Sequence, residues 1–299
     1  MAVVDIHEHV ILERGFLLPN GYTITTAEEL VAIMDRLGID QMVALPLTSP
    51  ETYHFVQSNE EVFHACDRFP DRFIKFCNVD PRITDNSPTH DFVPILEYYQ
   101  GQGAKGVGEV TANLWWDDAR VQQLLRACEA VGLPFLFHIA TQEYNTYGLI
   151  TERGLGGLER SLQRFPGLQF LCHSTAFWAE VGPMPAGENR GAYVKGRVLP
   201  GGKVPELLRA YPNMWGDLSA GSGYNAVSRD PEWGYDFIEE FQDRLLMGLD
   251  ICQPWNDEAS LIGFMRDAVE TGKISQGAFE KVMGRNAEQL LELESDTTT

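Results

Sequence analysis

Apolar residues are gathered along the chain in short continuous runs, and these runs alternate with segments of helical periodicity. Each run has the length of a strand, and most are apolar at every position rather than at every second one. Uninterrupted apolar runs are typical of parallel strands whose two faces are both covered. The pattern predicts eight strands, at residues 3–9, 41–46, 73–79, 104–110, 134–138, 168–173, 213–219 and 244–250.

Helix signals lie in the intervals between these strands. Thr26 and Glu29 have the spacing of a capping box, and Gly38 follows the end of the same predicted helix. Asp117 or Asp118 is placed to cap a later helix that Gly132 ends. The predicted strand ends are 29 to 46 residues apart, which is about one strand–helix unit for each interval.

Alternation of this kind predicts an α/β fold, either a (β/α)8 TIM barrel or an open doubly wound sheet. Polar residues of the same chemical type end the first, fifth, sixth and eighth strands, and an open sheet would hold its first and eighth strands apart. We therefore expect a barrel, which typically needs about 250 residues. One barrel domain is predicted over residues 1–299, with a frayed tail at 294–299.

The polar residues at the strand ends are of the types that bind metal ions. In a parallel barrel these ends converge on one mouth, where catalytic residues lie. Side chains alternate along a strand, so two histidines two positions apart point the same way while Glu8 between them points away. The sequence therefore predicts a metal site, with the candidate ligands His7, His9, His138, His173 and Asp250.

Glu109 adds a sixth candidate at the end of the fourth predicted strand. It could bind a metal ion directly, hold a ligand histidine in position, or act in catalysis, and the sequence leaves these roles open. Cys252 follows Asp250 by two residues, so it either lines the mouth or packs as a small apolar side chain.

Candidate substrate contacts follow other strand ends. Arg82 could hold a carboxylate with both guanidinium nitrogens, although a structural ion pair is an equal expectation. Trp178, Tyr224 and Asn225 belong to a group of polar and aromatic residues after strand ends, which favours a pocket for a flat or sugar-like substrate. Residues 174–203 hold nine Gly or Pro, and we expect this segment to form a wall or lid over the mouth.

Charge and composition narrow the partners to a small-molecule substrate. The net charge of −20 argues against nucleic acid and against anionic membrane surfaces, and no apolar stretch approaches the roughly 20 residues of a membrane span. The five cysteines form no CxxC pair, and the first strand leaves no room for a signal peptide. We expect a cytoplasmic protein, and a homo-oligomer is left open.

These residues give the chain a family resemblance. It resembles the amidohydrolase superfamily, and most of all its amidohydrolase-2 branch of metal-dependent hydrolases and decarboxylases. The resemblance rests on His7-Glu8-His9, His138, His173 and Asp250, together with residues 284–291, which are similar to the branch's C-terminal helix motif.

The resemblance implies a TIM barrel of the metallo-dependent hydrolase type and assigns roles to individual residues. It implies that His7, His9 and Asp250 are ligands, that His138 is a ligand as in most members, and that His173 acts on substrate or water in single-metal members. Glu109 stands where two-metal members carry a carboxylated lysine, as in the TatD-like branch, where a glutamate bridges two metals. The number of ions, one or two, therefore stays open.

The leading hypothesis is hydrolysis of an amide, ester or lactone bond by a metal-activated water. Asp250 would move the proton, and His173 would polarise the carbonyl group or stabilise the oxyanion. Zinc is the expected metal, with manganese as the alternative. Competing hypotheses are non-oxidative decarboxylation of an aromatic or unsaturated acid, a metal-free lactonase, and a barrel that binds a ligand without catalysis.

Overall fold

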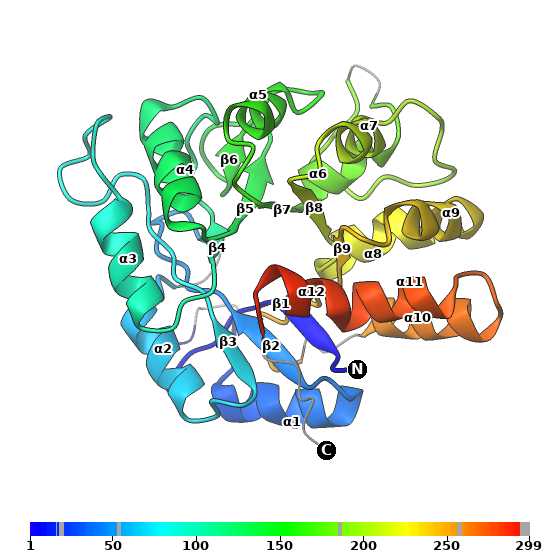
Figure 1. Cartoon of the computed structure of the whole chain (residues 1–299), viewed down its shortest axis with the longest axis horizontal. Helices are drawn as coiled ribbons and strands as arrows, with labels where there is room; N and C mark the ends of the chain where they lie inside the picture. The colour runs from blue at the N-terminus through cyan, green and yellow to red at the C-terminus, as the bar shows by residue number, and fades with distance from the viewer. Residues whose placement is uncertain (16, 18–20, 53–54, 185–186, 256–258, 294–299) are drawn as a thin grey trace.

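The computed structural model describes residues 1–15, 17, 21–52, 55–184, 187–255 and 259–293, so the predicted tail at 294–299 lies outside the described residues. Parallel strands surround the centre of the molecule and helices lie outside them (Figure 1). All eight predicted strands are present. They are β1 (Val4–Glu8), β2 (Gln41–Ala44), β3 (Phe73–Lys75), β4 (Val107–Val110), β5 (Phe135–Ala140), β7 (Phe170–His173), β8 (Met214–Asp217) and β9 (Leu245–Leu246).

Backbone hydrogen bonds close these strands into a ring. Regular pairing runs from β1 to β3 and from β4 to β9, with the short β6 (Leu149–Ile150) beside β5. The first junction is a bridge between Cys77 and Val107, which joins the end of β3 to β4. At the second, Ile6 N donates to Met247 O over 2.9 Å, which joins β1 to the chain after β9. The fold is the predicted TIM barrel.

The helices form where the sequence places their caps. Thr26 caps α1 (Ala27–Leu37) in a complete capping box with Glu29, and Gly38 ends it in the left-handed conformation at φ 72°. Asp118 caps α4 (Ala119–Val131), which Gly132 ends in the same way. The other helices of the outer layer are α2 (Asn59–Asp67), α3 (Val93–Gly101), α5 (Gly156–Arg164), α7 (Lys203–Ala210), α8 (Ala220–Ser228), α9 (Pro231–Phe241) and α10 (Ser260–Glu270).

The C-terminal elements cover the end of the barrel where the chain starts. They are α11 (Gln276–Glu280), the π-helical turn η2 (Lys281–Arg285) and α12 (Asn286–Leu290), seen in red beside β1 in Figure 1. A side chain at Gly284 is excluded, because its Cβ would lie 1.9 Å from Ala2 O. Asn286 donates to Gln242 O and Leu245 O, at 2.7 and 2.8 Å. These contacts account for the glycine at 284 and the asparagine at 286.

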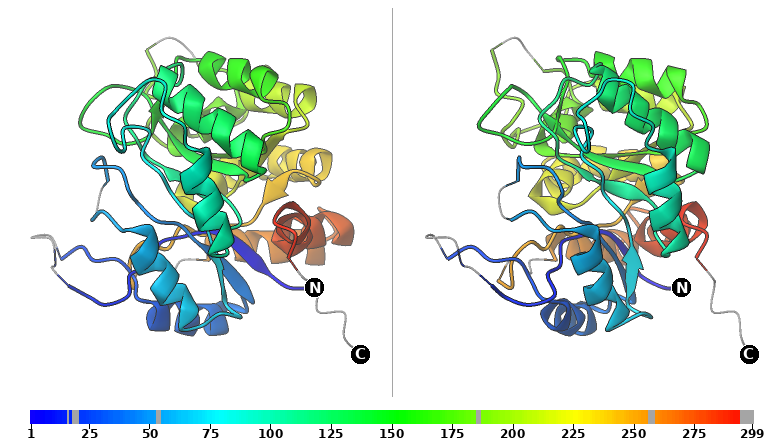
Figure 2. Two further views of the ribbon diagram at one scale, coloured as in Figure 1. Left: turned by 60° about the vertical axis from the view of Figure 1, so that its left-hand side comes forward. Right: turned by 90° about the vertical axis from the view of Figure 1, so that its left-hand side faces the viewer.

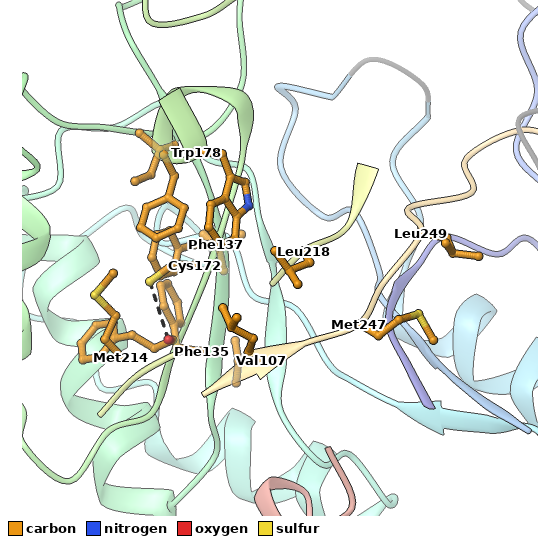
Figure 3. Close-up of a cluster of buried hydrophobic side chains, with 14 of the residues drawn as sticks. Val107, Phe135, Phe137, Cys172, Trp178, Met214, Leu218, Met247 and Leu249 are labelled. Carbon is orange, nitrogen blue, oxygen red and sulfur yellow. Dashed lines mark hydrogen bonds between the residues drawn. The ribbon is translucent and has the colours of Figure 1, made fainter. Parts of the chain in front are cut away.

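The hydrophobic core has two parts. The larger part lies between the strands and the outer helices, and it includes Val107, Phe135 and Phe137 (Figure 3). The smaller part joins residues from opposite strands, such as Val43 of β2 and Leu171 of β7, with α12. Strands on opposite sides of the ring meet only inside it, so this part fills the barrel as side chains do in such folds.

The loops that follow the strands extend from the end of the molecule opposite the two termini (Figure 2). This end is the predicted mouth, and the short helix α6 (Thr175–Trp178) and the 3₁₀ turn η1 (Ala179–Val181) come directly after β7 there. All five cysteines are free, as expected. Among the described residues, no helix has the length and apolar character needed to cross a membrane.

Candidate metal centre

Three imidazoles and two carboxylates from four strand ends converge at the mouth. The Nε2 atoms of His7 and His9 lie 3.7 and 3.4 Å from Glu109 Oε2, and 3.9 and 3.7 Å from Asp250 Oδ1. His173 Nε2 approaches the same carboxylates, 3.8 Å from Asp250 and 4.0 Å from Glu109. Most of these separations exceed direct hydrogen bonds and suit groups that face a shared ion.

The other ring nitrogen of each imidazole is held by a different part of the barrel. His9 Nδ1 donates to Leu45 O over 3.0 Å, and His7 Nδ1 donates to Asp217 Oδ2 over 2.7 Å. Because both acceptors are oxygens without a proton, the hydrogen of each neutral ring lies on Nδ1 and the lone pair on Nε2. Nε2 is then free to bind a metal ion, and the partner fixes the plane of the ring.

Glu109 faces two sides of the centre at once. Its Oε2 atom points to His7 and His9, whereas Oε1 accepts a hydrogen bond from His138 Nδ1 over 2.8 Å. His138 thus joins the cluster through the carboxylate. The groups able to share an ion include His7 with His173 and Asp250, His7 with His9 and Glu109, and Glu109 with His138 and His173.

The electrostatics of the cluster favour a bound cation. Burial opposes charge on His7, but Asp217 and Asp250 outweigh it and hold the pKa of His7 well above its usual value. Burial would raise the pKa of Glu109, yet the hydrogen bond from His138 and the nearby His7 and His9 hold it well below the usual range. Burial would also raise the pKa of Asp217, but the charge and the hydrogen bond of His7 lower it. Both carboxylates are therefore ionised in the interior, where a negative field attracts cations.

His173 differs from the other histidines of the cluster. Burial, followed by the nearby charge of His7, lowers the pKa of His173 to about 4, so the ring is neutral at pH 7. Its Nδ1 atom lies 2.8 Å from Ser219 Oγ and 3.4 Å from Asp217 Oδ2.

One atom tests directly whether the cluster fits a metal. His7 Nε2 is fully buried and has no hydrogen-bond partner within the protein. A buried polar atom without a partner costs about 1–3 kcal/mol, so native proteins seldom leave one unsatisfied. A cation between His7, His9, Glu109 and Asp250 would supply the missing partner, and imidazole with carboxylate is a donor set that divalent metals bind.

A cleft of about 680 Å³ opens beside this centre. Asp250 belongs to both, because its side chain faces the cluster and 18% of it is exposed. Cys252 lines the cleft, which is the first of the two roles expected for it. Its Sγ atom donates to Asp250 Oδ1 over 3.0 Å. The residues that line the cleft include Tyr22, Tyr147, Tyr193, Tyr224, Gln253 and Ser260.

The predicted substrate contacts are divided between the cleft and other places. Tyr224 lines the cleft, whereas Asn225 is not among its lining residues. Trp178 differs from the prediction. It is 2% exposed and packs against Phe237, and its Nε1 atom donates to Asp217 O over 2.8 Å. The reason is that α6 starts directly after β7 and turns the indole into the core.

Arg82 forms the structural ion pair that was the alternative to a substrate contact. Its guanidinium group is held by Asp80 at 2.7 Å and by Glu51 at 2.5 Å, so its donors are already engaged by the protein. A substrate carboxylate would have to displace one of these partners, which makes the predicted clamp on substrate unfavourable.

The residues that sequence reasoning missed are partners of the ligand candidates and one wall of the cleft. Asp217 holds His7, and Ser219 holds His173. Tyr193 lies in the segment 174–203 that was expected to cover the mouth, and it lines the cleft. Burial and the charge of Asp250 raise the pKa of Tyr193, so its hydroxyl stays protonated at pH 7.

A buried ion pair fixes this part of the wall. Arg190 Nη1 donates to Glu180 Oε1 over 2.7 Å, and both side chains are nearly inaccessible to solvent. Arg190 also donates to Thr151 O and Glu152 O, while Glu180 accepts from Gly154 N over 2.8 Å. The segment that carries Tyr193 is therefore attached to the loop after β6.

Comparisons with known proteins identify the family and the fold. The model of the family described as "Amidohydrolase" matches residues 4–293. No curated protein shows significant similarity to the chain. Several solved structures share the fold over nearly the full length of both chains.

One is a probable 2-pyrone-4,6-dicarboxylic acid hydrolase from Acinetobacter baumannii, with 18% identity, a TM-score of 0.58 and coverage of 98% of this chain and 100% of that one. An amidohydrolase from Burkholderia multivorans with bound zinc has 12% identity, a TM-score of 0.61 and the same coverage. The 5-carboxyvanillate decarboxylase of Sphingomonas paucimobilis has 15% identity, a TM-score of 0.60 and coverage of 98% and 99%.

Proposed function

The chain belongs to the amidohydrolase family, and from this we propose that it is a metal-dependent hydrolase that cleaves a C–N or C–O bond of a small molecule. One observation carries the proposal. The buried and unpartnered His7 Nε2 lies within 4 Å of Glu109 and Asp250, two carboxylates that His9 Nε2 also approaches, beside an open cleft.

The ligands of one divalent ion would be His7, His9 and Asp250, with Glu109 Oε2 as the fourth. His138 then orients Glu109 through the 2.8 Å hydrogen bond to its other oxygen. A second ion would have to lie between Glu109, His138 and His173 and would disrupt that hydrogen bond. We therefore propose one ion. Zinc is the proposed metal and manganese the alternative, since imidazole and carboxylate ligands suit both.

When bound, such an ion lowers the pKa of a water molecule from 15.7 to about 7, which makes hydroxide available at neutral pH. Asp250 would accept the proton of this water and return it to the leaving group, because it faces both the centre and the cleft. Ser219 can donate to His173 Nδ1, which leaves the proton of the neutral ring on Nε2. His173 would then donate to the substrate carbonyl oxygen and stabilise the oxyanion.

Metal content per chain tests the assignment of ligands. Protein purified without chelators or a histidine tag should contain close to one zinc by elemental mass spectrometry. A content close to two would favour Glu109 as a bridging ligand, with His138 and His173 on the second ion. Protein that neither retains nor rebinds a metal would overturn the proposal and favour the metal-free lactonase or the ligand-binding barrel.

Substitution of the proposed base tests the mechanism. Asp250→Asn should abolish turnover of a hydrolysable substrate while the far-UV circular dichroism spectrum stays unchanged. Asp117→Asn, at an exposed aspartate in the loop after β4, is the matched control and should behave as wild type. Unchanged turnover in Asp250→Asn would exclude Asp250 as the base.

Non-oxidative decarboxylation of a carboxylic acid is the second candidate. Its support is the fold shared with a decarboxylase together with Asp250, which could transfer a proton to carbon in the same position. Release of carbon dioxide from an acid substrate would distinguish this reaction from hydrolysis. We also propose a cytoplasmic location, which the five free cysteines support.

A further inference from the structure

The cleft beside the metal centre is walled by tyrosines from separate parts of the chain. Tyr22 precedes α1, Tyr147 follows β5, Tyr193 lies in the segment after β7, and Tyr224 is on α8. Gln253 and Ser260 complete its polar lining, and Asp250 lies at its inner end. This wall offers ring faces and uncharged hydrogen-bonding groups.

No lysine or arginine lines the cleft among the residues that the structure describes. The positions outside that description carry neither residue type in the sequence, so every lysine and arginine of the chain is accounted for. Lys195 and Arg197 follow Tyr193 on its segment, but both are exposed and neither is a lining residue.

Three arginines in loops at the mouth are held by the protein's own carboxylates. Arg14 donates to Glu29 over 2.6 Å. Arg82 is bound between Asp80 and Glu51, and Arg190 is paired with Glu180 in the interior. Each guanidinium group therefore already has a counter-charge, and none is free to turn toward a substrate anion.

An anionic group would be unstable in such a cleft. A carboxylate that leaves water is compensated best by a cation, and neutral hydroxyl and amide donors replace only part of its hydration, so its transfer is costly. The net charge of −20 also lowers the concentration of anions near the surface. Aromatic rings, by contrast, stack on tyrosine faces, and hydroxyl or amide groups bond to their hydroxyls.

We propose that the part of the substrate that occupies this cleft is an uncharged aromatic or hydroxylated ring, and that carboxylate, phosphate and sulfate groups are excluded there. This inference rests on the proposed hydrolase function, and it names the substrate class of that same site. It also disfavours aromatic acids with a second anionic group, since the metal ion can compensate only the group that it binds.

Two esters of equal size test whether the cleft excludes anionic groups. 4-Acetoxybenzamide and 4-acetoxybenzoate differ in one group, which is a neutral amide in the first and a carboxylate in the second. In both, the oxygen of water bonds to the acetyl carbon, the bond from that carbon to the phenolic oxygen breaks, and the phenolic oxygen takes a proton. The products are acetic acid, ionised at neutral pH, and the free phenol.

With the metal-loaded full-length chain, kcat/KM should be higher for the amide by on the order of tenfold or more, because the carboxylate loses hydration in the cleft without a cation in exchange. Ser260 is exposed at the start of α10 and allows the charge of the cleft to be changed. Ser260→Lys should reduce the preference for the amide, whereas the uncharged control Ser260→Gln should retain it. Equal or better turnover of the benzoate by the wild type would overturn the inference.

Binding separates this inference from the proposed function. 4-Hydroxybenzamide and 4-hydroxybenzoate can be compared by calorimetry on the same metal-loaded protein, without any turnover. Tighter binding of the amide with no hydrolysis of either ester would support the exclusion of anionic groups from the cleft and would count against the proposed hydrolase function. Tighter binding of the benzoate would overturn the exclusion of anionic groups from the cleft, even if both esters are hydrolysed.

Discussion

The ion pair between Arg190 and Glu180 provides the sharpest test of how the cleft wall is held. Arg190→Met removes the guanidinium group but keeps an apolar side chain of comparable length. Three hydrogen bonds are lost, to Glu180, Glu152 O and Thr151 O, and the Glu180 carboxylate keeps only Gly154 N as a partner. Breaking a buried pair by removal of one partner costs about 3–5 kcal/mol.

That free energy should appear as local opening of the segment that carries Tyr193. A loss of about 3 kcal/mol raises the open population about a hundredfold or more. Lys195 and Arg197 are exposed trypsin sites within the segment, so the cleavage rate there should rise by a similar factor, as measured by mass spectrometry of the products. The KM for a substrate should rise as well, because Tyr193 loses its fixed position.

Two variants serve as controls. Arg160→Met removes an exposed arginine that pairs with Asp117 and Glu152, and exposed pairs contribute only about 0–1 kcal/mol. The double variant Arg190→Met with Glu180→Leu replaces both charges by apolar groups and should recover most of the lost protection. The reasoning is refuted if Arg190→Met is cleaved no faster than Arg160→Met.

Three further predictions concern the metal centre and the base of the barrel. Asp217→Asn weakens the hydrogen bond that positions His7, so zinc affinity measured against a chelating dye should fall about 10- to 100-fold. The control Asp243→Asn, at an exposed aspartate, should leave the zinc affinity unchanged. Equal zinc affinities of the two variants would contradict a positioning role for Asp217. Gly284→Ala should lower the free energy of unfolding in urea by about 1–3 kcal/mol because of the contact with Ala2, whereas Gly263→Ala, with open space around it, should not destabilise. Removal of metal with a chelator should lower the Tm, and added zinc should restore it. At a free zinc concentration of 100 times the Kd, the free energy of unfolding should rise by about 2.7 kcal/mol. An unchanged Tm would exclude a metal site in the folded chain.

The positions of the strands and the convergence of the ligand candidates were accessible from the sequence for one physical reason. A buried parallel strand must be apolar, so a polar residue at its end stands out, as His138 and His173 do. The ring then brings all such ends to one mouth. The caps of α1 and α4 were predictable for an equally local reason, since each uses residues within a few positions of its helix.

Other parts of the site depend on contacts that no local pattern records. Asp217 holds His7 across 210 residues, and Glu51 engages Arg82 across 31. Trp178 was expected at the cleft because it follows a strand end, but the immediate turn into α6 buries it. Tyr193 lies in a long irregular segment without periodicity, so only its place after β7 indicated that it would be near the mouth.

The candidate metal centre spans the seam where the first and last strands of the barrel close. Asp250 N donates to His7 O over 2.9 Å, although nearly the whole chain separates these two residues. A growing chain that has not yet supplied β9 holds His7 and His9 but lacks Asp250, so the centre is completed late in folding. The closed ring should therefore bind the ion more tightly than open intermediates do, and a bound ion would stabilise the closed barrel relative to them.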